Sequence, residues 1–485
     1  MTEPPATVNS GAAYTVQWNN YGLQGEIPNA KLEFYDGTVW NNIDYKTTNT
    51  WIVSNSGSYG WTVPVDVRSV ACKFRVSDPN NATATDDTNP FEIRPLISVS
   101  APAGTAKWVI GTQTGNNIVW SITGPVPTVK IEYSKDNGSN YTYVISPSVA
   151  GNSSPFEWNI PADKDLVTDH TVGLEQRARV RVMDTSLSSV YGLSSGLFMV
   201  KGSITVTNPN ASSPALKVGV AQNIEWTTPC TGACTMGNVK VQFSRTGGAP
   251  WTDVATVGFD SSPYTLWTPP IDSITNNAKE AKMRVEQVIN GEVVDDSDAF
   301  EIEGIIRLDS PDIDAPTWFV GDPRQIKWTP TGTFGYVKIE YSSNGFTNES
   351  ATVVEAPTYA NSANNVQAAY DWTVPNLIGS NFKVRISDVN DANVVDVSSS
   401  PFVIKGKVVV SEPNGGETWY VNDTNRKIKW QATGPIPTVR IEYSKNNGGL
   451  WTEIVPDAAA GAGAGEYPWP SVADAISDHC LVRVS

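Results

Sequence analysis

The densest group of oxygen-bearing side chains lies close to residue 390. Asp388, Asn390, Asp391 and Asn393 stand in the string Asp-Val-Asn-Asp-Ala-Asn. Carboxylate and amide oxygens are the ligands that Ca²⁺ prefers, and the ion takes about six to eight of them. Asp and Asn are also ordinary turn residues. The pattern therefore marks these four residues as a candidate calcium site, with a plain turn as the alternative, and no other cofactor is expected.

Two of the four cysteines lie in one loop. Cys230 and Cys234 enclose Thr-Gly-Ala, and this spacing allows a small disulfide, which an oxidising compartment would favour. A metal site would need a second ligand pair or a nearby His, which the loop lacks. Cys72 and Cys480 stand at equivalent positions, three residues before a repeated Arg, and are predicted to be small buried hydrophobes.

Nucleophilic or acid–base catalysis finds little support in the residue types. The chain has two histidines, His170 and His479, and each follows an Asp. No Ser or Cys elbow of the G-x-S-x-G kind stands near them, so a role in a turn is predicted for both. We therefore expect no catalytic residues and no enzyme activity.

Composition narrows the classes of partner. The 485 residues include 34 Lys and Arg against 50 Asp and Glu, a formal net charge of −16. Duplex nucleic acid and anionic membranes require a basic footprint, so neither is expected as a partner. No apolar run approaches the roughly 18 residues of a membrane-spanning helix, so no membrane insertion is expected either. The hydrophobic fraction of 40% is that of a folded chain.

Tryptophan reveals an internal repeat of just over 100 residues. One column of Trp closes an alternating segment such as Ile-Lys-Trp, and a second column is usually followed by Thr and then Pro. Residues that recur in register in every copy are most simply buried, so both columns are predicted to form the core. The first column is Trp18, Trp120, Trp226, Trp328 and Trp430, and the second is Trp61, Trp158, Trp267, Trp372 and Trp469.

The remaining tryptophans allow an alternative. Trp108, Trp318 and Trp419 share a third column, and Trp40, Trp251 and Trp451 a fourth, while Trp51 is off-register. Aromatic rings in a row on the surface would make a carbohydrate-binding platform. Packing inside each copy is the simpler interpretation of both columns.

Two polar patterns also repeat. Ser134 to Gly138 and Ser444 to Gly448 resemble the Asp box, whose physical content is a turn: Asp or Asn accepts backbone N–H bonds and Gly takes a positive φ. An arginine recurs within one predicted strand, and we expect it to pair with a sheet neighbour or with the Glu of the strand that carries the repeated Phe or Tyr. The arginines are Arg75, Arg181, Arg284, Arg385 and Arg483, and the acids are Glu33, Glu132, Glu340 and Glu442.

Each copy reads as about seven short strands separated by Gly, Pro, Asn and Asp clusters, with no sustained helical period. This pattern is typical of a two-sheet β-sandwich with local connections and antiparallel pairing. We predict an all-β chain of five tandem Ig-like or fibronectin-III-like seven-stranded sandwiches, spanning residues 1–95, 96–202, 203–304, 305–406 and 407–485.

The linkers between copies have only about one to three residues, too few for a flexible tether. The sandwiches should therefore form a stiff rod of roughly 150 Å, from about 30 Å per copy. The first copy is expected to lack its first strand and the fifth its last strand. Either the chain is a window on a longer array, or a neighbouring chain supplies the missing strands.

The repeat resembles a known module. PNGGETWYVNDTNRKIKW and TGPIPTVRIEYSKNNGGLWTEI, followed by YxWTVP and RVSD segments, are similar to Ig-like modules of microbial surface and secreted proteins. The closest resemblance is to the β-sandwich module of the Ser-Thr-rich GPI-anchored cell-wall family. It implies an extracellular or cell-surface location and brings no catalytic residues.

These features favour a structural role. We predict a section of a long cell-surface or extracellular fibre, sheath or S-layer-type protein that associates with copies of itself or of a longer repeat protein. The alternative is an adhesin or carbohydrate-binding stalk that contacts cell-wall glycan through a feature found in one copy only. Trp51 and the Cys230–Cys234 loop are the two obvious features of that kind.

Overall fold

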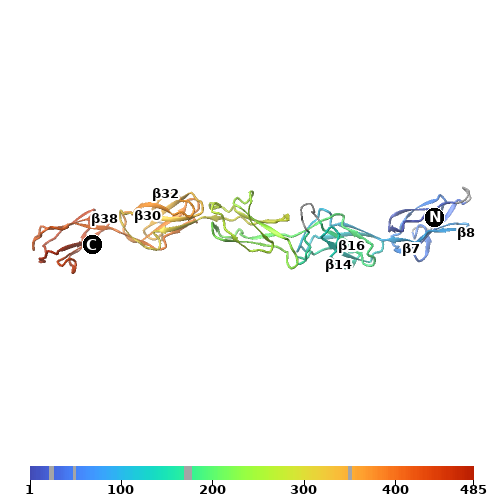
Figure 1. Ribbon diagram of the computed structural model, residues 1–485, viewed down its shortest axis with the longest axis horizontal. Helices are drawn as coiled ribbons and strands as arrows, with labels where there is room; N and C mark the ends of the chain where they lie inside the picture. Colours follow the sequence, from blue (N-terminus) through green and yellow to red (C-terminus); the bar gives the residue numbers. More distant parts are fainter. Residues whose placement is uncertain (21–26, 47–50, 169–176, 348–351, 462) are drawn as a thin grey trace.

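The computed structural model describes residues 1–20, 27–46, 51–168, 177–347, 352–461 and 463–485. Every regular element in these ranges is a β-strand. The described residues contain no apolar helix of the length that crossing a bilayer requires. The chain is long and narrow, and successive segments follow one another along its longest axis from the N-terminal end (blue) to the C-terminal end (red) (Figure 1).

The strands fall into five successive groups, and no sheet contains strands from two groups. We call these groups units 1 to 5. The boundaries predicted at residues 95, 202, 304 and 406 lie between the last strand of one unit and the first strand of the next. Only one to three residues separate those strands.

The strand bounds of the first two units are as follows. Unit 1 contains β1 (Thr7–Asn9), β2 (Ala13–Gln17), β3 (Asn29–Tyr35), β4 (Trp40–Asn42), β5 (Ile52–Ser54), β6 (Ser58–Thr62), β7 (Ser69–Asp78), β8 (Asn81–Asp87) and β9 (Phe91–Arg94). Unit 2 contains β10 (Leu96–Ala101), β11 (Lys107–Val109), β12 (Asn117–Thr123), β13 (Thr128–Ser134), β14 (Tyr143–Ala150), β15 (Phe156–Glu157), β16 (Arg179–Asp184), β17 (Tyr191–Leu193) and β18 (Met199–Lys201).

The remaining units repeat this order. Unit 3 contains β19 (Thr205–Asn208), β20 (Leu216–Lys217), β21 (Gln222–Thr227), β22 (Asn238–Ser244), β23 (Thr252–Gly258), β24 (Tyr264–Trp267), β25 (Lys282–Gln287), β26 (Asn290–Asp296) and β27 (Ile302–Glu303). Unit 4 contains β28 (Ile305–Ser310), β29 (Thr317–Phe319), β30 (Pro323–Thr331), β31 (Tyr336–Ser342), β32 (Thr352–Ala360), β33 (Ala368–Thr373), β34 (Gly379–Asp388), β35 (Val395–Val397) and β36 (Phe402–Lys405). Unit 5 contains β37 (Lys407–Glu412), β38 (Lys427–Thr433), β39 (Thr438–Ser444), β40 (Thr452–Ala459), β41 (Ala464–Pro468) and β42 (Leu481–Val484).

Unit 4 illustrates the topology. One sheet has the order β28-β30-β33, and the other has the order β29-β36-β34-β31-β32, with β35 also paired to β34. The seven predicted strands of this unit are all present, and the all-β, tandem Ig-like sandwich fold is confirmed. The strands β29 and β35 were not predicted, because three residues are too few to show an alternating pattern.

Most strands pair antiparallel, as expected, but units 1 to 4 each contain one parallel strand pairing that was not expected. The first strand of the sandwich is divided: β28 pairs antiparallel with β30, and then β29 pairs parallel with β36 on the opposite sheet. The same parallel pairing joins β1 to β9, β11 to β18, and β20 to β27. The crossing lets one segment close an edge of each sheet, which reduces the unpaired backbone at both edges.

Both predicted tryptophan columns lie inside the sandwiches, with relative exposures between 0 and 9%. Each indole N–H of the first column donates a hydrogen bond to the segment that follows the outer strand beside the Phe/Tyr strand. This bond satisfies the polar end of a buried ring. The acceptors are Asn55 Oδ1, the carbonyls of Gly151 and Phe259, Asn361 Oδ1 and the carbonyl of Ala460, at 2.8 to 3.0 Å.

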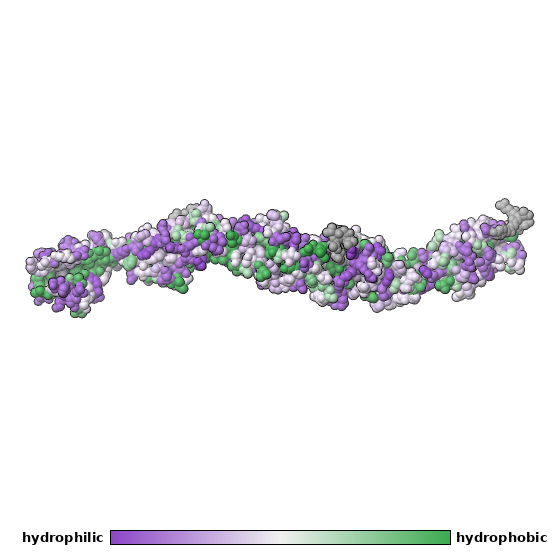
Figure 2. Space-filling model, in the orientation of Figure 1, coloured by the Kyte–Doolittle hydropathy of each residue, from purple (hydrophilic) through white to green (hydrophobic). Residues whose placement is uncertain are grey.

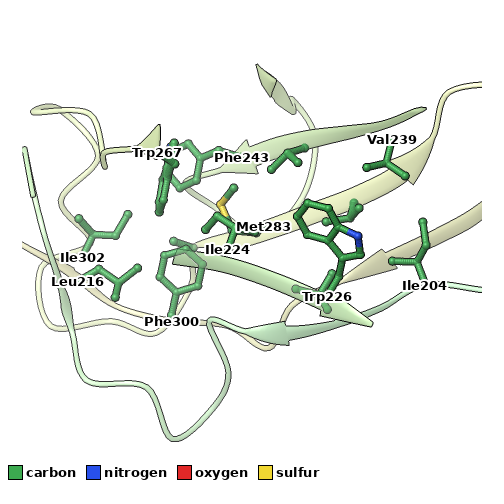
Figure 3. Packing of buried hydrophobic residues seen from close by; sticks show 14 of the residues in the cluster. Ile204, Leu216, Ile224, Trp226, Val239, Phe243, Trp267, Met283, Phe300 and Ile302 are labelled. Carbon is green, nitrogen blue, oxygen red and sulfur yellow. The ribbon is translucent and has the colours of Figure 1, made fainter. Parts of the chain in front are cut away.

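The second column forms the other end of each core. In unit 3, Trp267 packs against Phe243 with ring centroids 5.2 Å apart, and Phe300 lies below them, while Trp226 lies toward the other end (Figure 3). Every unit has this pair, with centroid separations of 5.0 to 5.4 Å. The same aromatic contact therefore recurs in all five units.

Replacing Trp158 by Ala should destabilise unit 2 by about 3–5 kcal/mol, because a buried ring leaves a cavity between the sheets. Hydrogen exchange of peptides from β13 and β16 measures the effect, and peptides from β38 and β39 in unit 5 serve as an internal control. Unchanged exchange in unit 2 would contradict the assignment of this column to the core.

Candidate functional site: the junctions between units

The Asp-box-like turns are hairpins. Asp136 Oδ1 accepts hydrogen bonds from Ser134 Oγ at 2.6 Å and from the Asn140 N–H at 2.9 Å. Gly138 takes a φ of +81°, and its N–H donates to Ser134 Oγ. Asn446 accepts equivalent bonds in unit 5, so the turn does not require a carboxylate. The motif therefore has a structural role.

The repeated arginines are sandwiched between an acid and an aromatic ring. In units 2, 4 and 5 the guanidinium donates to the predicted Glu, as Arg181 does to Glu132 at 2.6 Å. In units 1 and 3 the partner is instead an Asp on the neighbouring hairpin strand, Asp87 or Asp296. In all five units the guanidinium carbon also lies over an aromatic ring, 4.0 to 4.6 Å from the ring centroid. Those rings are Trp40, Tyr141, Trp251, Phe346 and Trp451.

The structure describes all 17 tryptophans, and each is buried or half-buried. They therefore form no exposed row. Trp108 and Trp318 of the third column pack on the second column, at 6.0 and 5.7 Å. The fourth column covers the arginines. Trp51 is half-buried, with Lys31 Nζ 5.0 Å above its ring. Hydrophilic residues cover most of the visible face, with hydrophobic ones in scattered groups (Figure 2).

The two free cysteines differ. Cys72 is buried, and its burial raises the pKa of the thiol to about 11, so it is a poor nucleophile. The prediction that Cys480 is buried is wrong, because it is exposed. In units 1 to 4 a Phe of the last strand stands beside this position, as Phe91 does beside Cys72, and the described residues of unit 5 include no counterpart.

Of the two histidines, His479 lies in the described part of the chain. His479 is exposed, and its Nε2 lies 3.5 Å from Asp478. His170 lies outside the described residues.

The junctions hold the most distinctive contacts of the molecule. The residue that directly follows the last strand of a unit is glycine at three of the four junctions: Gly202, Gly304 and Gly406. An apolar side chain of the following unit packs directly on each. A Cβ at these positions would lie only 2.5 to 2.7 Å from Met236, Phe334 and Ile436. Glycine is therefore required by the close approach of a side chain to the backbone.

A second contact recurs at two junctions. The Thr231 N–H of unit 3 donates to the Ala162 carbonyl of unit 2 at 2.9 Å. Likewise the Thr333 N–H of unit 4 donates to the Ile271 carbonyl of unit 3 at 2.9 Å. Both carbonyls stand four residues after the Trp of the second column. Units 2 and 3 thus receive the same loop of the following unit on the same face.

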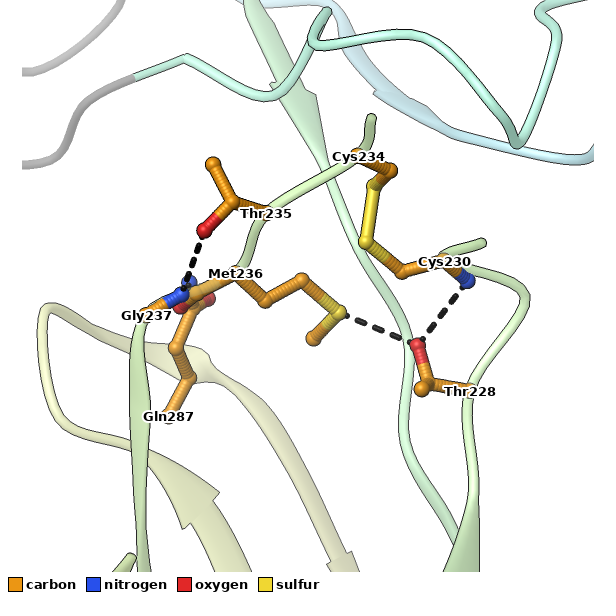
Figure 4. Close-up of a disulfide and its surroundings, with 7 residues drawn as sticks. All are labelled: Thr228, Cys230, Cys234, Thr235, Met236, Gly237 and Gln287. Atoms are coloured by element: carbon orange, nitrogen blue, oxygen red, sulfur yellow. Dashed lines mark hydrogen bonds between the residues drawn. A yellow bond between two sulfur atoms is a disulfide. The ribbon is translucent and has the colours of Figure 1, made fainter. Parts of the chain in front are cut away.

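Cys230 and Cys234 form a disulfide within this loop of unit 3. Figure 4 shows the bridge above Met236, whose sulfur lies 3.0 Å from Thr228 Oγ1. Between the two cysteines, the Ala233 N–H donates to the Asp163 carbonyl of unit 2 at 3.1 Å. The disulfide therefore closes a loop that rests on the preceding unit.

The predicted calcium residues separate into two sets. Asp388 and Asp391 are 3% and 1% exposed, whereas Asn390 and Asn393 are exposed and use their backbone N–H groups to close turns on the two aspartates. Asp391 lies instead beside Glu301 and Glu303 of unit 3. One carboxylate oxygen of each of these three residues lies within 4.8 Å of the others. We call this group the junction carboxylates.

Inspection of the sequence missed Glu301 and Glu303, although a signal was present. The third residue after the repeated Phe is Arg94, Lys201 or Lys405 in other units, and only unit 3 has an acid there, Glu303. The charge reversal at one repeat position distinguishes this junction.

Asp136→Asn should remove a pH-dependent contribution from unit 2. Hydrogen bonds from the Ser134 hydroxyl and then from the Asn140 side-chain amide and backbone N–H lower the pKa of Asp136 from 3.8 to about 2. Because the folded-state pKa is depressed, the stabilisation is present above about pH 4 and is lost as the pH falls toward 2. The difference in Tm between wild type and variant should shrink over that interval, measured for unit 2. A difference that does not change with pH would contradict this assignment.

Cys230→Ser/Cys234→Ser should release the loop at the junction of units 2 and 3, with a loss of about 2 kcal/mol for so short a loop. Hydrogen exchange of residues 229–236 should accelerate. The loop around Thr333 makes the corresponding contact without a disulfide, and its exchange should not change. Equal exchange in the two proteins at 229–236 would show that the bridge does not brace this contact.

The sequence and the fold can be compared with those of known proteins. No protein-family model matches the sequence and no curated protein is similar to it, so the likeness to the GPI-anchored cell-wall module remains a resemblance. Among solved structures, a tetra-tandem repeat in the extending region of a large adhesion protein is 14% identical, with a TM-score of 0.27, over 78% of this chain and 91% of that one. The Sidekick-1 immunoglobulin domains 1–5 are 9% identical, with a TM-score of 0.17, over 100% and 96%. The N-terminal eight Ig domains of the Down syndrome cell adhesion molecule are 11% identical, with a TM-score of 0.21, over 100% and 62%. At these scores the likenesses carry no argument about function.

Proposed function

We propose that this chain is a stiff spacer, a section of a long extracellular or cell-surface protein that holds other parts at a distance. The observation that carries the proposal is the continuity of the hydrophobic core. Buried residues from Ile97 in unit 2 to Ile404 in unit 4 form one cluster. A hinge between units 2 and 3 or between units 3 and 4 would have to break apolar contacts in that cluster, at a cost of roughly 25 cal/mol per Å² exposed.

The outer junctions add polar contacts. Arg68 of unit 1 lies 2.8 Å from Asp184 of unit 2, whose carboxylate is 1% exposed. Lys407 of unit 5 pairs with Asp322 of unit 4 and lies 5.5 Å from the ring of Phe319. Units 1 and 5 have cores that are separate from the shared cluster. Their junctions with units 2 and 4 therefore depend more on ion pairs than the junctions among units 2, 3 and 4 do.

An oxidising, extracellular compartment is part of the proposal. A disulfide persists where thiols are not kept reduced, and the Cys230–Cys234 bridge closes a junction loop. The net charge of −16 disfavours nucleic acid and anionic membranes as partners. The resemblance of the repeat to modules of microbial surface proteins supports the same location.

A fibre, sheath or S-layer is the finer form of this proposal, and it adds contacts between copies of the chain. Self-association would then raise the particle mass with concentration while each chain stays straight. A glycan-binding stalk is less favoured, because the tryptophans other than Trp51 pack in the cores or against arginines, and Lys31 lies over the ring of Trp51.

Small-angle X-ray scattering of the whole chain over a concentration series tests the proposal. The wild type should give a rod of about 150 Å with little flexibility. Gly304→Val places a side chain against Phe334 and Ile274, which should cost about 1–3 kcal/mol and bend the rod. Gly335→Val is the matched control, since a Cβ there meets nothing within 4 Å. A flexible wild-type chain, or equal effects of the two variants, would count against a stiff spacer.

A further inference from the structure

The junction between units 3 and 4 brings three carboxylates together from two separately folded sandwiches. Glu301 and Glu303 stand on either side of Ile302 in the last strand region of unit 3. Asp391 lies in the turn between β34 and β35 of unit 4. Their closest oxygens lie within 4.8 Å of one another, which is close enough for all three to contact a single ion.

Glu303 and Asp391 are buried, Glu301 is half-buried, and their negative charge is only partly compensated. Asp391 is 1% exposed, and its Oδ2 has no hydrogen-bond partner. Glu301 Oε1 is likewise buried without a partner, and Glu303 is 5% exposed. Lys217 pairs with Glu303, which leaves the other two carboxylates without an ion pair at hydrogen-bond range. A buried carboxylate without a compensating charge is costly.

At the other junctions, the equivalent positions carry neutral side chains or an acid that is paired with an arginine. At the junction of units 2 and 3, Met199 stands at the position of Glu301, and Asn290 at that of Asp391. The Asn290 Nδ2 lies 3.6 Å from the Met199 sulfur. The same two positions are therefore in contact at this junction too, but both side chains are neutral. At the junction of units 1 and 2, Arg68 faces the buried Asp184, which is the counterpart of Asp388. No arginine faces Asp388, because Asn277 stands at the position of Arg68 in unit 3.

The pKa shifts of the acidic residues at this junction agree with this geometry. Burial, then the charges of Asp391 and Glu303, raise the pKa of Glu301. Burial and the charge of Asp391 also raise the pKa of Asp388, whose Oδ2 has no partner. Like charges in a desolvated site are relieved by a cation, and carboxylates are the ligands of hard divalent ions.

We propose that Glu301, Glu303 and Asp391 bind one divalent cation of the Ca²⁺ class, which ties unit 3 to unit 4. Three carboxylates supply up to six oxygens when each is bidentate, which suits the high and flexible coordination number of Ca²⁺. Asp388 adds negative charge behind Asp391. We do not include Asn390 and Asn393 among the proposed ligands, because they are exposed and contribute backbone N–H groups to the turns. The inference rests on the proposed spacer function, to which it adds a cation-dependent joint.

The test uses the whole chain, stripped with EDTA and dialysed. Isothermal titration calorimetry with CaCl₂, to about 1 mM, should give one binding event per chain, in the range of extracellular modules. The same concentration should raise the Tm of units 3 and 4 by mass action. The double variant Glu301→Met/Asp391→Asn installs the pair already used at the preceding junction, so it should fold and lose the binding event. Glu292→Gln, which removes a carboxylate at that preceding junction, should keep it.

Binding by the wild type and by Glu292→Gln, with loss in the double variant, supports the site. An absence of both heat and a Tm shift in the wild type overturns it, and so does binding that survives in the double variant. Scattering in EDTA separates this inference from the spacer proposal. A straight rod that binds no Ca²⁺ leaves the spacer standing and removes the cation, whereas a flexible chain that binds Ca²⁺ removes the spacer and keeps the site.

Discussion

At three of the four junctions, the arrangement depends on the contact between an apolar side chain of one unit and the glycine that directly follows the last strand of the preceding unit. Met236, Phe334 and Ile436 each cover a glycine, and any larger residue there would separate the two bodies. Short linkers alone would bring the units near one another without fixing their angle. The packed side chain restricts the angle, because it lies so close to the glycine that no room for a Cβ remains between them.

The interior of each unit is uniform, whereas the junctions are individual. Every core uses the same pair of tryptophans and the same indole hydrogen bond. The junctions differ in chemistry: an Arg–Asp pair joins units 1 and 2, a disulfide-closed loop joins units 2 and 3, and carboxylates lie between units 3 and 4. Residues that pack the fold are repeated, and so is the glycine contact at three junctions, while the polar residues and the disulfide around that contact differ from junction to junction.

The sequence was most informative where a pattern repeats. Trp columns in register predicted the core, because five copies share one interior. Parallel pairing of β29 with β36 could not be predicted, since a strand alternates with the same period in either direction. Glu301 and Asp391 are 90 residues apart, so their proximity depends on how two sandwiches meet. Asn390 and Asn393 were included in the calcium prediction because they are near Asp391 in sequence, but the turn leaves them exposed.

The parallel pairing at the edge of units 1 to 4 has a mechanical consequence. When the chain is stretched from its ends, tension enters a unit through its first strand and leaves through its last. In unit 2, for example, β11 and β18 lie side by side and run in the same direction. Tension would therefore slide them past one another and load all their hydrogen bonds together, rather than opening the bonds one at a time. A tether built this way resists pulling more strongly than its modest sheets would imply.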